Sequence, residues 1–137
     1  KPGGSVYLED FFERNPLTDT EKQILAKDVF CPYLPDLETY KQHLVQAGFK
    51  FKKYGSRIID FDQIAIIYVS LRQVEDLTDE WREYTKQRVE SFEKKRDSFV
   101  RLHGEDTYQR LLYFYTKVRD LFAGGNLGGV RIVAEML

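Results

Sequence analysis

Apolar residues recur at helical spacing in four segments of this chain. Thr18 and Glu21 have the form of a capping box, and they begin a first helix that we expect to end before Pro32. Asp36 is positioned to cap a second helix, and Gly48 is a natural residue just beyond its C-terminal end. The first third of the chain therefore predicts two short helices.

Two longer helices are predicted in the second half. The first begins at Thr78 and ends at Gly104, and its apolar side comprises Trp81, Tyr84, Val89, Phe92 and Phe99. The second runs from about Asp106 to Phe122, with an apolar stripe comprising Tyr108, Leu111, Leu112, Tyr115, Val118 and Phe122. Charges of both signs are interspersed on the other side of the first helix, as expected for a solvent-exposed face.

Alternation of apolar and polar residues predicts strands at both ends of the chain. Residues 5–9 follow a Pro-Gly-Gly turn and are predicted to form a short strand. A loop is predicted to begin at Asp10. Residues 130–135 alternate in the same way and predict a terminal strand. Residues 49–51 and the β-branched run at 58–69 indicate further strands. The pattern as a whole predicts an α/β fold class.

Composition excludes several classes of function. The chain has 137 residues, which fits one domain, and its 21 basic and 22 acidic residues leave no footprint for nucleic acid or an anionic membrane. No stretch approaches the ~20 apolar residues of a membrane span, and no signal peptide is recognisable. The single cysteine, Cys31, favours a reducing compartment. We expect a cytoplasmic protein.

The histidines and the cysteine do not form a recognisable ligand set. His43 and His103 are far apart in sequence, and neither is close to Cys31. We therefore expect no metal. Cys31 itself is predicted to be a buried structural thiol rather than a nucleophile, because no histidine is near it in sequence.

Four glycines lie within residues 124–129. A phosphate-binding loop comes between a strand and a helix, so that the N–H groups of the helix N-terminus point at the anion. Here the helix comes first and the strand follows, so the carbonyl end of the helix faces the glycines. We predict a helix C-cap and a tight turn, in which Gly128 and Gly129 let the backbone turn sharply into the last strand.

Two places carry candidate ligand-binding residues. Tyr113, Lys117 and Arg119 point away from the apolar stripe of the last helix, and rings with cations suit an anionic or quaternary-ammonium ligand. Ordinary packing with exposed cations is the alternative. Asp10 follows the first strand, and ligands of open α/β sheets bind beyond the carboxyl ends of strands.

These segments together resemble a known family. The stretch KPGGSVYLEDFF resembles class I S-adenosylmethionine-dependent methyltransferases, in which a K-P-G-G turn precedes a fifth strand that ends in an acid. The stretches LPDLETYKQHLVQAGF, VEDLTDEW and GGVRIVAE are laid out as in the phosphoethanolamine and sarcosine/dimethylglycine N-methyltransferases. The resemblance implies that residues 1–137 form a single partial domain: strands five to seven of a Rossmann-like sheet, with capping helices.

The resemblance also implies what lies outside this chain. In the family, the glycine-rich donor loop and the main catalytic residues precede the K-P-G-G turn, and no GxGxxG motif occurs here. We expect the chain to be a fragment that is inactive alone, with S-adenosylmethionine bound mainly by the missing N-terminal half of the domain. Residues 51–72 depart from the family pattern, either as an inserted hairpin or as a segment foreign to that fold.

Acceptor-binding positions can be carried over one by one. Asp10 matches the acid that ends the fifth strand, and Phe11 stands where the phosphobase enzymes have a phosphate-binding Tyr. The phosphobase enzymes also have an Arg and a Tyr ahead of the helix that contains ETY, and Tyr33 is the nearby residue that could correspond to them. Lys117 falls at the position of a phosphate-binding Lys of those enzymes. Because one hydroxyl and an Arg are missing, an amino acid or betaine precursor, its carboxylate held by Lys117 or Arg119, fits better than a phosphobase.

The implied function is methyl transfer from S-adenosylmethionine to a small amine: an amino acid, a betaine precursor or a phosphobase. The chain would supply the acceptor-side cap, with its catalytic residues unassigned. One alternative is an S-methyltransferase of the same fold. Another is a non-catalytic module whose long charged helix docks a partner. Burial of Trp81 and Phe92 against the chain's own sheet would favour the enzyme, because a docking helix needs an exposed apolar stripe.

Overall fold

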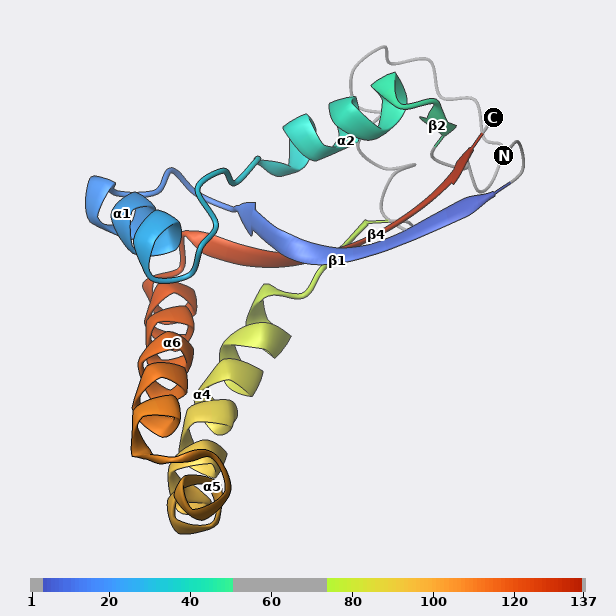
Figure 1. Cartoon of the computed structure of the whole chain (residues 1–137). Coiled ribbons are helices and arrows are strands. Elements are labelled where there is room, and N and C mark those ends of the chain that lie inside the picture. The colour runs from blue at the N-terminus through green and yellow to red at the C-terminus, as the bar shows by residue number, and fades with distance from the viewer. Residues whose placement is uncertain (1–3, 51–73, 137) are drawn as a thin grey trace.

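The computed structural model describes residues 4–50 and 74–136 (Figure 1). The elements follow the order β1 (Ser5–Glu13), α1 (Asp19–Lys27), α2 (Leu37–Gln46), β2 (Phe49–Lys50), β3 (Val74–Asp76), α4 (Thr78–Lys94), α5 (Arg96–His103), α6 (Glu105–Gly124) and β4 (Leu127–Met136). The predicted α/β class is therefore confirmed. The strands expected at 58–69 and the insertion expected at 51–72 lie outside the described residues.

β1 and β4 form a long antiparallel ribbon, which we call the β1–β4 ribbon (Figure 1). Its register runs from Ser5 opposite Glu135 to Glu13 opposite Leu127. β2 and β3 pair antiparallel with β4 as well, so that β4 is the central strand of the described sheet. The strands predicted at the two ends of the chain are both present, and they pair with each other. Their numbering as strands of a larger sheet stays a prediction.

β1 is longer than its sequence pattern indicated. The prediction of a loop from Asp10 onward is wrong, because the strand continues to Glu13. The added residues find backbone partners in β4, with Asp10 opposite Val130. Pairing across the sheet thus overrides the local signal, and Asp10 lies within a strand rather than at its end.

The predicted caps of the first two helices are confirmed. The Thr18 hydroxyl accepts a hydrogen bond from the backbone N–H of Glu21 at 3.2 Å, and the Glu21 carboxylate accepts one from the backbone N–H of Thr18 at 2.8 Å. Asp36 accepts a hydrogen bond from the backbone N–H of Thr39 at 2.7 Å. Each cap satisfies an N–H group that the helix itself leaves without a partner.

The long helix expected from Thr78 to Gly104 is divided into two. α4 ends at Lys94 and α5 begins at Arg96, while Gly104 ends α5 with a φ of +85°, as predicted. α6 is close to the predicted fourth helix. None of the helices within residues 4–50 and 74–136 has the length and apolar character needed to cross a membrane.

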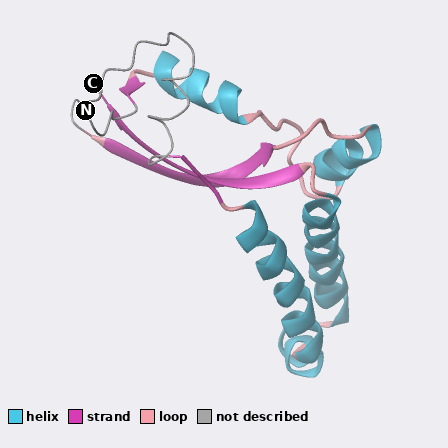
Figure 2. Cartoon of the chain, turned by 180° about the vertical axis from the view of Figure 1, so that it is seen from behind, coloured by secondary structure: helices cyan, strands magenta, loops and turns pink. Residues whose placement is uncertain are grey.

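Helices cover the two faces of the β1–β4 ribbon in different ways (Figures 1 and 2). α2 lies along one face, where Phe12, Val130 and Ile132 form a buried cluster against its apolar side. α4 and α6 project away from the ribbon on the other side and contact each other, and α5 lies at their far end. A second buried cluster forms where α1 and α6 meet the start of β4: Leu17, Leu25, Val118, Leu121, Phe122 and Leu127.

The glycines after α6 have two different roles. Gly125 ends the helix in the left-handed conformation with a φ of +82°, which confirms the predicted C-cap. Gly128 and Gly129 lie within β4, so the prediction that they turn the backbone is wrong. A Cβ added to Gly128 would come within 2.4 Å of the Phe12 ring, and one added to Gly129 within 2.5 Å of the Trp81 ring. Their missing side chains give space to two aromatic rings.

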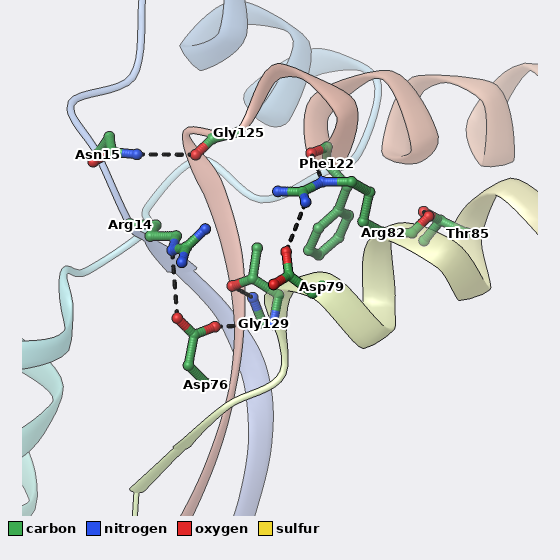
Figure 3. Close-up of polar contacts among 10 residues, drawn as sticks. Arg14, Asn15, Asp76, Asp79, Arg82, Thr85, Phe122, Gly125 and Gly129 are labelled. Atoms are coloured by element: carbon green, nitrogen blue, oxygen red, sulfur yellow. Dashed lines mark hydrogen bonds and ion pairs between the residues drawn. The ribbon is translucent and has the colours of Figure 1, made fainter.

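Polar contacts join α4 to the ribbon and to α6 (Figure 3). The backbone N–H of Gly129 donates to the Thr78 hydroxyl at 3.2 Å, and the backbone N–H of Leu77 donates to the Gly129 carbonyl at 2.8 Å. Arg82 Nε donates to the Phe122 carbonyl near the C-terminal end of α6 at 3.2 Å, where backbone carbonyls lack helical partners. These bonds fix the start of α4 beside the end of α6.

Candidate functional site

A cavity of about 500 Å³, which we call the wedge pocket, lies between β1 and the α4–α6 pair. Its size is within the range of small-molecule sites, and most of its lining is aromatic. The lining residues are Glu9 and Phe11 from β1, Glu80, Trp81, Tyr84, Thr85 and Arg88 from α4, and Phe114, Tyr115, Val118 and Phe122 from α6. These elements are far apart in sequence, so the pocket is a product of the fold.

Local geometry explains why these side chains share the pocket. Trp81, Tyr84 and Arg88 are three and four residues apart on α4, a spacing that places them on one helical face. Glu9 and Phe11 alternate with Asp10 along β1, so they point to the same side of the strand. The residue spacing along α4 and the alternation along β1 therefore place these side chains around one cavity.

Three aromatic rings form the end of the wedge pocket nearest the ribbon. Phe11, Trp81 and Phe122 meet edge to face, with ring centroids 5.7 to 6.1 Å apart. Phe122 is completely buried, and Trp81 is partly buried with its ring against Gly129. Edge-to-face packing is favourable because the positive edge of one ring meets the negative face of another. Trp81 thus packs against the chain's own sheet, as the enzyme interpretation expected.

Phe92 does not follow that expectation. It stacks on Tyr108 with ring centroids 5.0 Å apart, and it also meets Phe99 and Tyr115 edge to face. These contacts lie among α4, α5 and α6. The prediction that Phe92 packs against the sheet is therefore wrong, because α4 runs away from the ribbon and Phe92, in a later turn, packs on rings of α5 and α6.

Arg88 brings a positive charge to the pocket. Its guanidinium donates a hydrogen bond to the Tyr115 hydroxyl at 3.1 Å, and its Cζ lies 4.9 Å from the centroid of that ring. The hydrogen bond to Tyr115, with a smaller effect of nearby Tyr84, raises the pKa of Arg88 further above its ordinary value. The guanidinium is therefore charged throughout the physiological pH range.

Glu9 brings negative charge to the same pocket. Its carboxylate accepts hydrogen bonds from the Tyr7 hydroxyl at 2.5 Å and from Arg131 Nε at 2.7 Å. These two hydrogen bonds lower the pKa of Glu9, so the group is ionised at neutral pH. Arg131 also pairs with Glu75 at 2.8 Å. The charge of Glu9 is thus shared with a neighbouring cation, while Glu80 lines the pocket as a second acid.

The two candidate residues on β1 lie on opposite faces of the strand. Phe11 lines the wedge pocket, whereas Asp10 points to the α2 face, where it accepts a hydrogen bond from the Tyr40 hydroxyl at 2.7 Å. Cys31 lies near Asp10: burial raises the pKa of its thiol, and the Asp10 carboxylate raises it further. The Cys31 thiol donates to the Tyr33 carbonyl at 3.3 Å, while the Tyr33 side chain is exposed.

The other candidates lie on the outer surface of α6. The Lys117 Nζ is 5.1 Å from the centroid of the exposed Tyr113 ring, which makes a cation–π pair. Arg119 pairs with Asp120 at 2.8 Å. Neither these three candidates nor Asp10 and Tyr33 line the wedge pocket, so of the predicted acceptor residues the structure places Phe11 there alone. The binding roles of the others stay predictions.

Comparison with known proteins shows which fold this chain shares. No protein-family model matches the chain, and no curated protein matches its sequence. Solved structures do match. Phosphoethanolamine N-methyltransferase 2 of Haemonchus contortus, in complex with phosphomonomethylethanolamine and S-adenosylhomocysteine, gives a TM-score of 0.71 at 20% identity, covering 99% of this chain and 27% of that one.

Two cyclopropane synthases match as well. MmaA2 of Mycobacterium tuberculosis gives a TM-score of 0.69 at 14% identity, covering 98% of this chain and 45% of that one. The mycolic acid cyclopropane synthase CmaA1 gives 0.63 at 13% identity, covering 97% of this chain and 47% of that one. The chain has the fold of part of a class I S-adenosylmethionine-dependent methyltransferase. It spans 27% to 47% of the length of these structures, and at such identities the likeness concerns the fold alone.

The glycine-rich run at residues 124–129 is not arranged as a phosphate-binding loop. The run follows the C-terminal end of α6 and leads into β4, which reverses the strand-then-helix order of such a loop. Nor do residues 4–50 and 74–136 bring together three His, Cys, Asp or Glu side chains that could hold a metal ion. The wedge pocket is the candidate ligand site that the described residues form.

The sequence interpretation assigned no ligand-binding role to Glu9, Glu80 and Arg88. A signal for Arg88 was present, because Arg88 lies four residues after Tyr84 and seven after Trp81 on the side identified as apolar. A charged residue within an apolar stripe indicates a pocket or an ion pair. The signal for Glu9 was its place beside Asp10 near the end of the predicted first strand, and its contact with the pocket depends on how β1 meets α4.

Proposed function

We propose that this chain is the acceptor-side portion of an S-adenosylmethionine-dependent methyltransferase that acts on a small amine. The wedge pocket carries the proposal, because aromatic rings with acidic groups nearby attract a protonated or methylated amine. The shared fold supports the reaction class. The Haemonchus enzyme was solved with phosphomonomethylethanolamine, which is itself a small amine.

In this proposal the chain orients the acceptor and shields it from water, and it does not bind the methyl donor. Sequence outside this chain, the N-terminal half of the domain, would hold S-adenosylmethionine, whose sulfonium supplies the methyl group. The rings of Phe11 and Trp81, which pack on the buried Phe122, would fix the acceptor and exclude water from its nitrogen. Orientation and desolvation are large sources of rate in bimolecular transfers.

Burial along α4 supports the enzyme over the interaction module. Val89 is 2% exposed, and Trp81 packs on the ribbon, so the apolar side of α4 is occupied by the chain itself. Tyr84 is the exception at 60% exposed, and it lies in the wedge pocket. A helix that docks a protein partner would present more of its apolar stripe to solvent.

The first test concerns the donor. We expect this chain alone to bind S-adenosylmethionine negligibly in calorimetric titration, because its glycines lie on the wrong side of a helix for a phosphate or nucleotide loop. Binding in the micromolar range would contradict the proposed division of the site.

The second test concerns the acceptor. The chain is joined to the donor-binding half that the proposal requires, and transfer of labelled methyl groups is measured to amines, thiols and an unsaturated fatty acid. We expect transfer to amines, and a loss of about tenfold or more in Phe11→Ala, which removes one pocket wall. Leu102→Ser on the exposed surface of α5 is the matched control. Transfer to thiols alone would establish the S-methyltransferase instead, and transfer to the fatty acid alone would contradict an amine acceptor.

A further inference from the structure

The two edges of β1 are used differently. One edge pairs with β4 along the whole strand, from Ser5 to Glu13. In an antiparallel pair, the N–H and C=O groups of alternate residues point to the partner strand, and those of the residues between them point away. The N–H of Glu13 donates to the Pro35 carbonyl at 2.9 Å, and Pro35 precedes α2. The odd-numbered residues of β1 therefore direct their backbone groups to the outward edge.

The register of β4 agrees with this assignment. Gly129 lies opposite Phe11, and its N–H and carbonyl bond to Thr78 and Leu77 rather than to β1. Phe11 and Gly129 thus form a pair without mutual hydrogen bonds, and the N–H of Phe11 points outward as well. The outward edge of β1 comprises the backbone groups of Ser5, Tyr7, Glu9, Phe11 and Glu13.

The chain itself closes the second half of this edge. The Asp10 carboxylate accepts a hydrogen bond from the N–H of Phe11 at 2.7 Å and another from the Tyr40 hydroxyl at 2.7 Å. At Glu13 the loop before α2 takes the place of a strand, with a parallel bridge between Glu13 and Asp36. A further strand would have to displace these contacts to pair with β1 beyond Asp10.

The first half of the edge is open among the described residues. Within residues 4–50 and 74–136, β1 pairs with β4 alone, and the N–H groups of Ser5, Tyr7 and Glu9 have no acceptor. Tyr7 is 62% exposed, whereas Phe12 in the second half of the strand is 5% exposed. Open N–H and C=O groups along a strand pair readily with another strand, so native proteins cover or blunt such edges.

We infer that the outward edge of β1 docks one further strand along Ser5–Glu9, and that Asp10 sets the point where the two strands separate. The inference rests on the proposed function, because the docking strand belongs to the donor-binding half of the domain, outside this chain. The matched structures support that source, since the match covers 97% to 99% of this chain but 27% to 47% of theirs. Main-chain hydrogen bonds to an added strand supply the affinity.

An aspartate suits the end of the docking edge. One Asp10 oxygen accepts the Phe11 N–H and the other accepts the Tyr40 hydroxyl, so Tyr40 holds the carboxylate against the edge. Asp10 thereby has a positioning role in place of the acceptor-binding role predicted for it, since it does not line the wedge pocket. Beyond this point Phe11 has no neighbouring strand on the outward edge, and its side chain lines the wedge pocket.

The experiment measures amide hydrogen exchange by NMR in the full chain alone and in the protein joined to the donor-binding half. In the chain alone, the Tyr7 and Glu9 amides should exchange within about tenfold of an unstructured peptide, while Leu8, which faces β4, is protected. In the joined protein, Tyr7 and Glu9 should exchange at least about 100-fold more slowly.

Asp10→Ala tests the end of the edge. It removes the acceptor of the Phe11 N–H, so Phe11 should exchange at least about tenfold faster in the chain alone, with Tyr7 and Glu9 unchanged. Asp10→Asn retains an acceptor oxygen and should give an intermediate rate. Glu90→Ala on the exposed surface of α4 is the matched control and should change none of these rates.

A pair of variants at Tyr7 tests the docking itself. Tyr7→Pro removes an outward N–H and leaves the pairing with β4 in place, because proline is tolerated where its nitrogen faces away from the ladder. Tyr7→Val removes the same ring and keeps the N–H. In the joined protein, Glu9 should lose at least about tenfold of its protection in Tyr7→Pro but not in Tyr7→Val.

Each contrary outcome has a distinct meaning. Tyr7 and Glu9 amides that are protected in the chain alone, or exposed in both forms, overturn the docking edge. Protection that rises with the concentration of the chain alone identifies a second copy as the occupant and overturns it too. Unchanged exchange of Phe11 in Asp10→Ala overturns the role of Asp10.

Methyl transfer to amines by the joined protein is measured in parallel. Transfer with an unprotected edge refutes the docking edge and leaves the proposed function standing. A protected edge without transfer supports the docking edge and refutes the proposed function.

Discussion

An aromatic ring packs on a glycine of β4 on each face of the β1–β4 ribbon, but the surroundings of the two rings differ. On one face Phe12 rests on Gly128, and α2 closes over it. On the other face Trp81 rests on Gly129, and the wedge pocket opens beside it. Adjacent glycines thus each accept an aromatic ring, one in a closed core and one at a ligand-sized cavity.

The direction of the helices explains the difference (Figure 2). α2 runs along the ribbon, and Leu37, Tyr40 and Leu44 on its apolar side pack on the buried cluster of that face. α4 and α6 run away from the ribbon, so only the turns nearest to it, with Trp81 and Phe122, pack tightly. Tyr84 and Arg88, one and two turns farther on, keep much of their surface exposed. One face therefore serves stability and the other is open to a ligand.

The largest effect is expected where the pocket meets the core. Phe122 is completely buried against Phe11 and Trp81, so Phe122→Ala should lower the free energy of unfolding by about 3–5 kcal/mol, measured by urea denaturation of the full chain. Phe12→Ala on the other face should cost a similar amount. Only Phe122→Ala should shift Trp81 emission, because Phe122 contacts that ring.

The control for this comparison is Leu102→Ser, which is 71% exposed and should change stability by less than about 0.5 kcal/mol. A loss below about 1 kcal/mol in Phe122→Ala would mean that the α4–α6 pair packs on the ribbon more loosely than these contacts indicate.

A smaller effect is expected for the glycines themselves. Gly128→Ala and Gly129→Ala each place a methyl group against an aromatic ring, which should cost about 1–3 kcal/mol in urea denaturation. Gly129→Ala must displace Trp81 and should alter its emission, whereas Gly128→Ala displaces Phe12 and should not. An equal change of Trp81 emission in both variants would show that the two faces are not independent.

Much of this fold could be predicted from local signals. The capping box at Thr18, the cap at Asp36 and the glycines that end α2 and α5 are each set by residues within one turn of the helix end. The burial of Val130, Ile132 and Ala134 on one side of β4 follows from strand alternation alone.

The features that could not be predicted depend on partners distant in sequence. β1 extends through Asp10 because β4 offers a matching edge, and Gly129 is needed because Trp81, 48 residues earlier, rests on it. For the same reason Asp10 and Phe11, adjacent in sequence and both expected at the acceptor site, point to opposite faces. Family resemblance identified the fold, but the local pattern could not assemble the wedge pocket.

The smallest expected effect tests whether the α2 face is purely structural. Burial, and then the hydrogen bond from its hydroxyl to Asp10, raise the pKa of Tyr40 above its ordinary value. Ionisation of Tyr40 therefore favours the unfolded chain, and its contribution to stability should be complete below about pH 10 and lost above it. Tyr40→Phe should cost about 1 kcal/mol at pH 8 and flatten the decline in the urea midpoint between pH 9 and 11. If instead Tyr40→Phe left stability unchanged and reduced methyl transfer in the joined protein, Asp10 and Tyr40 would belong to the acceptor site after all, and the division between a closed face and a binding face would fail.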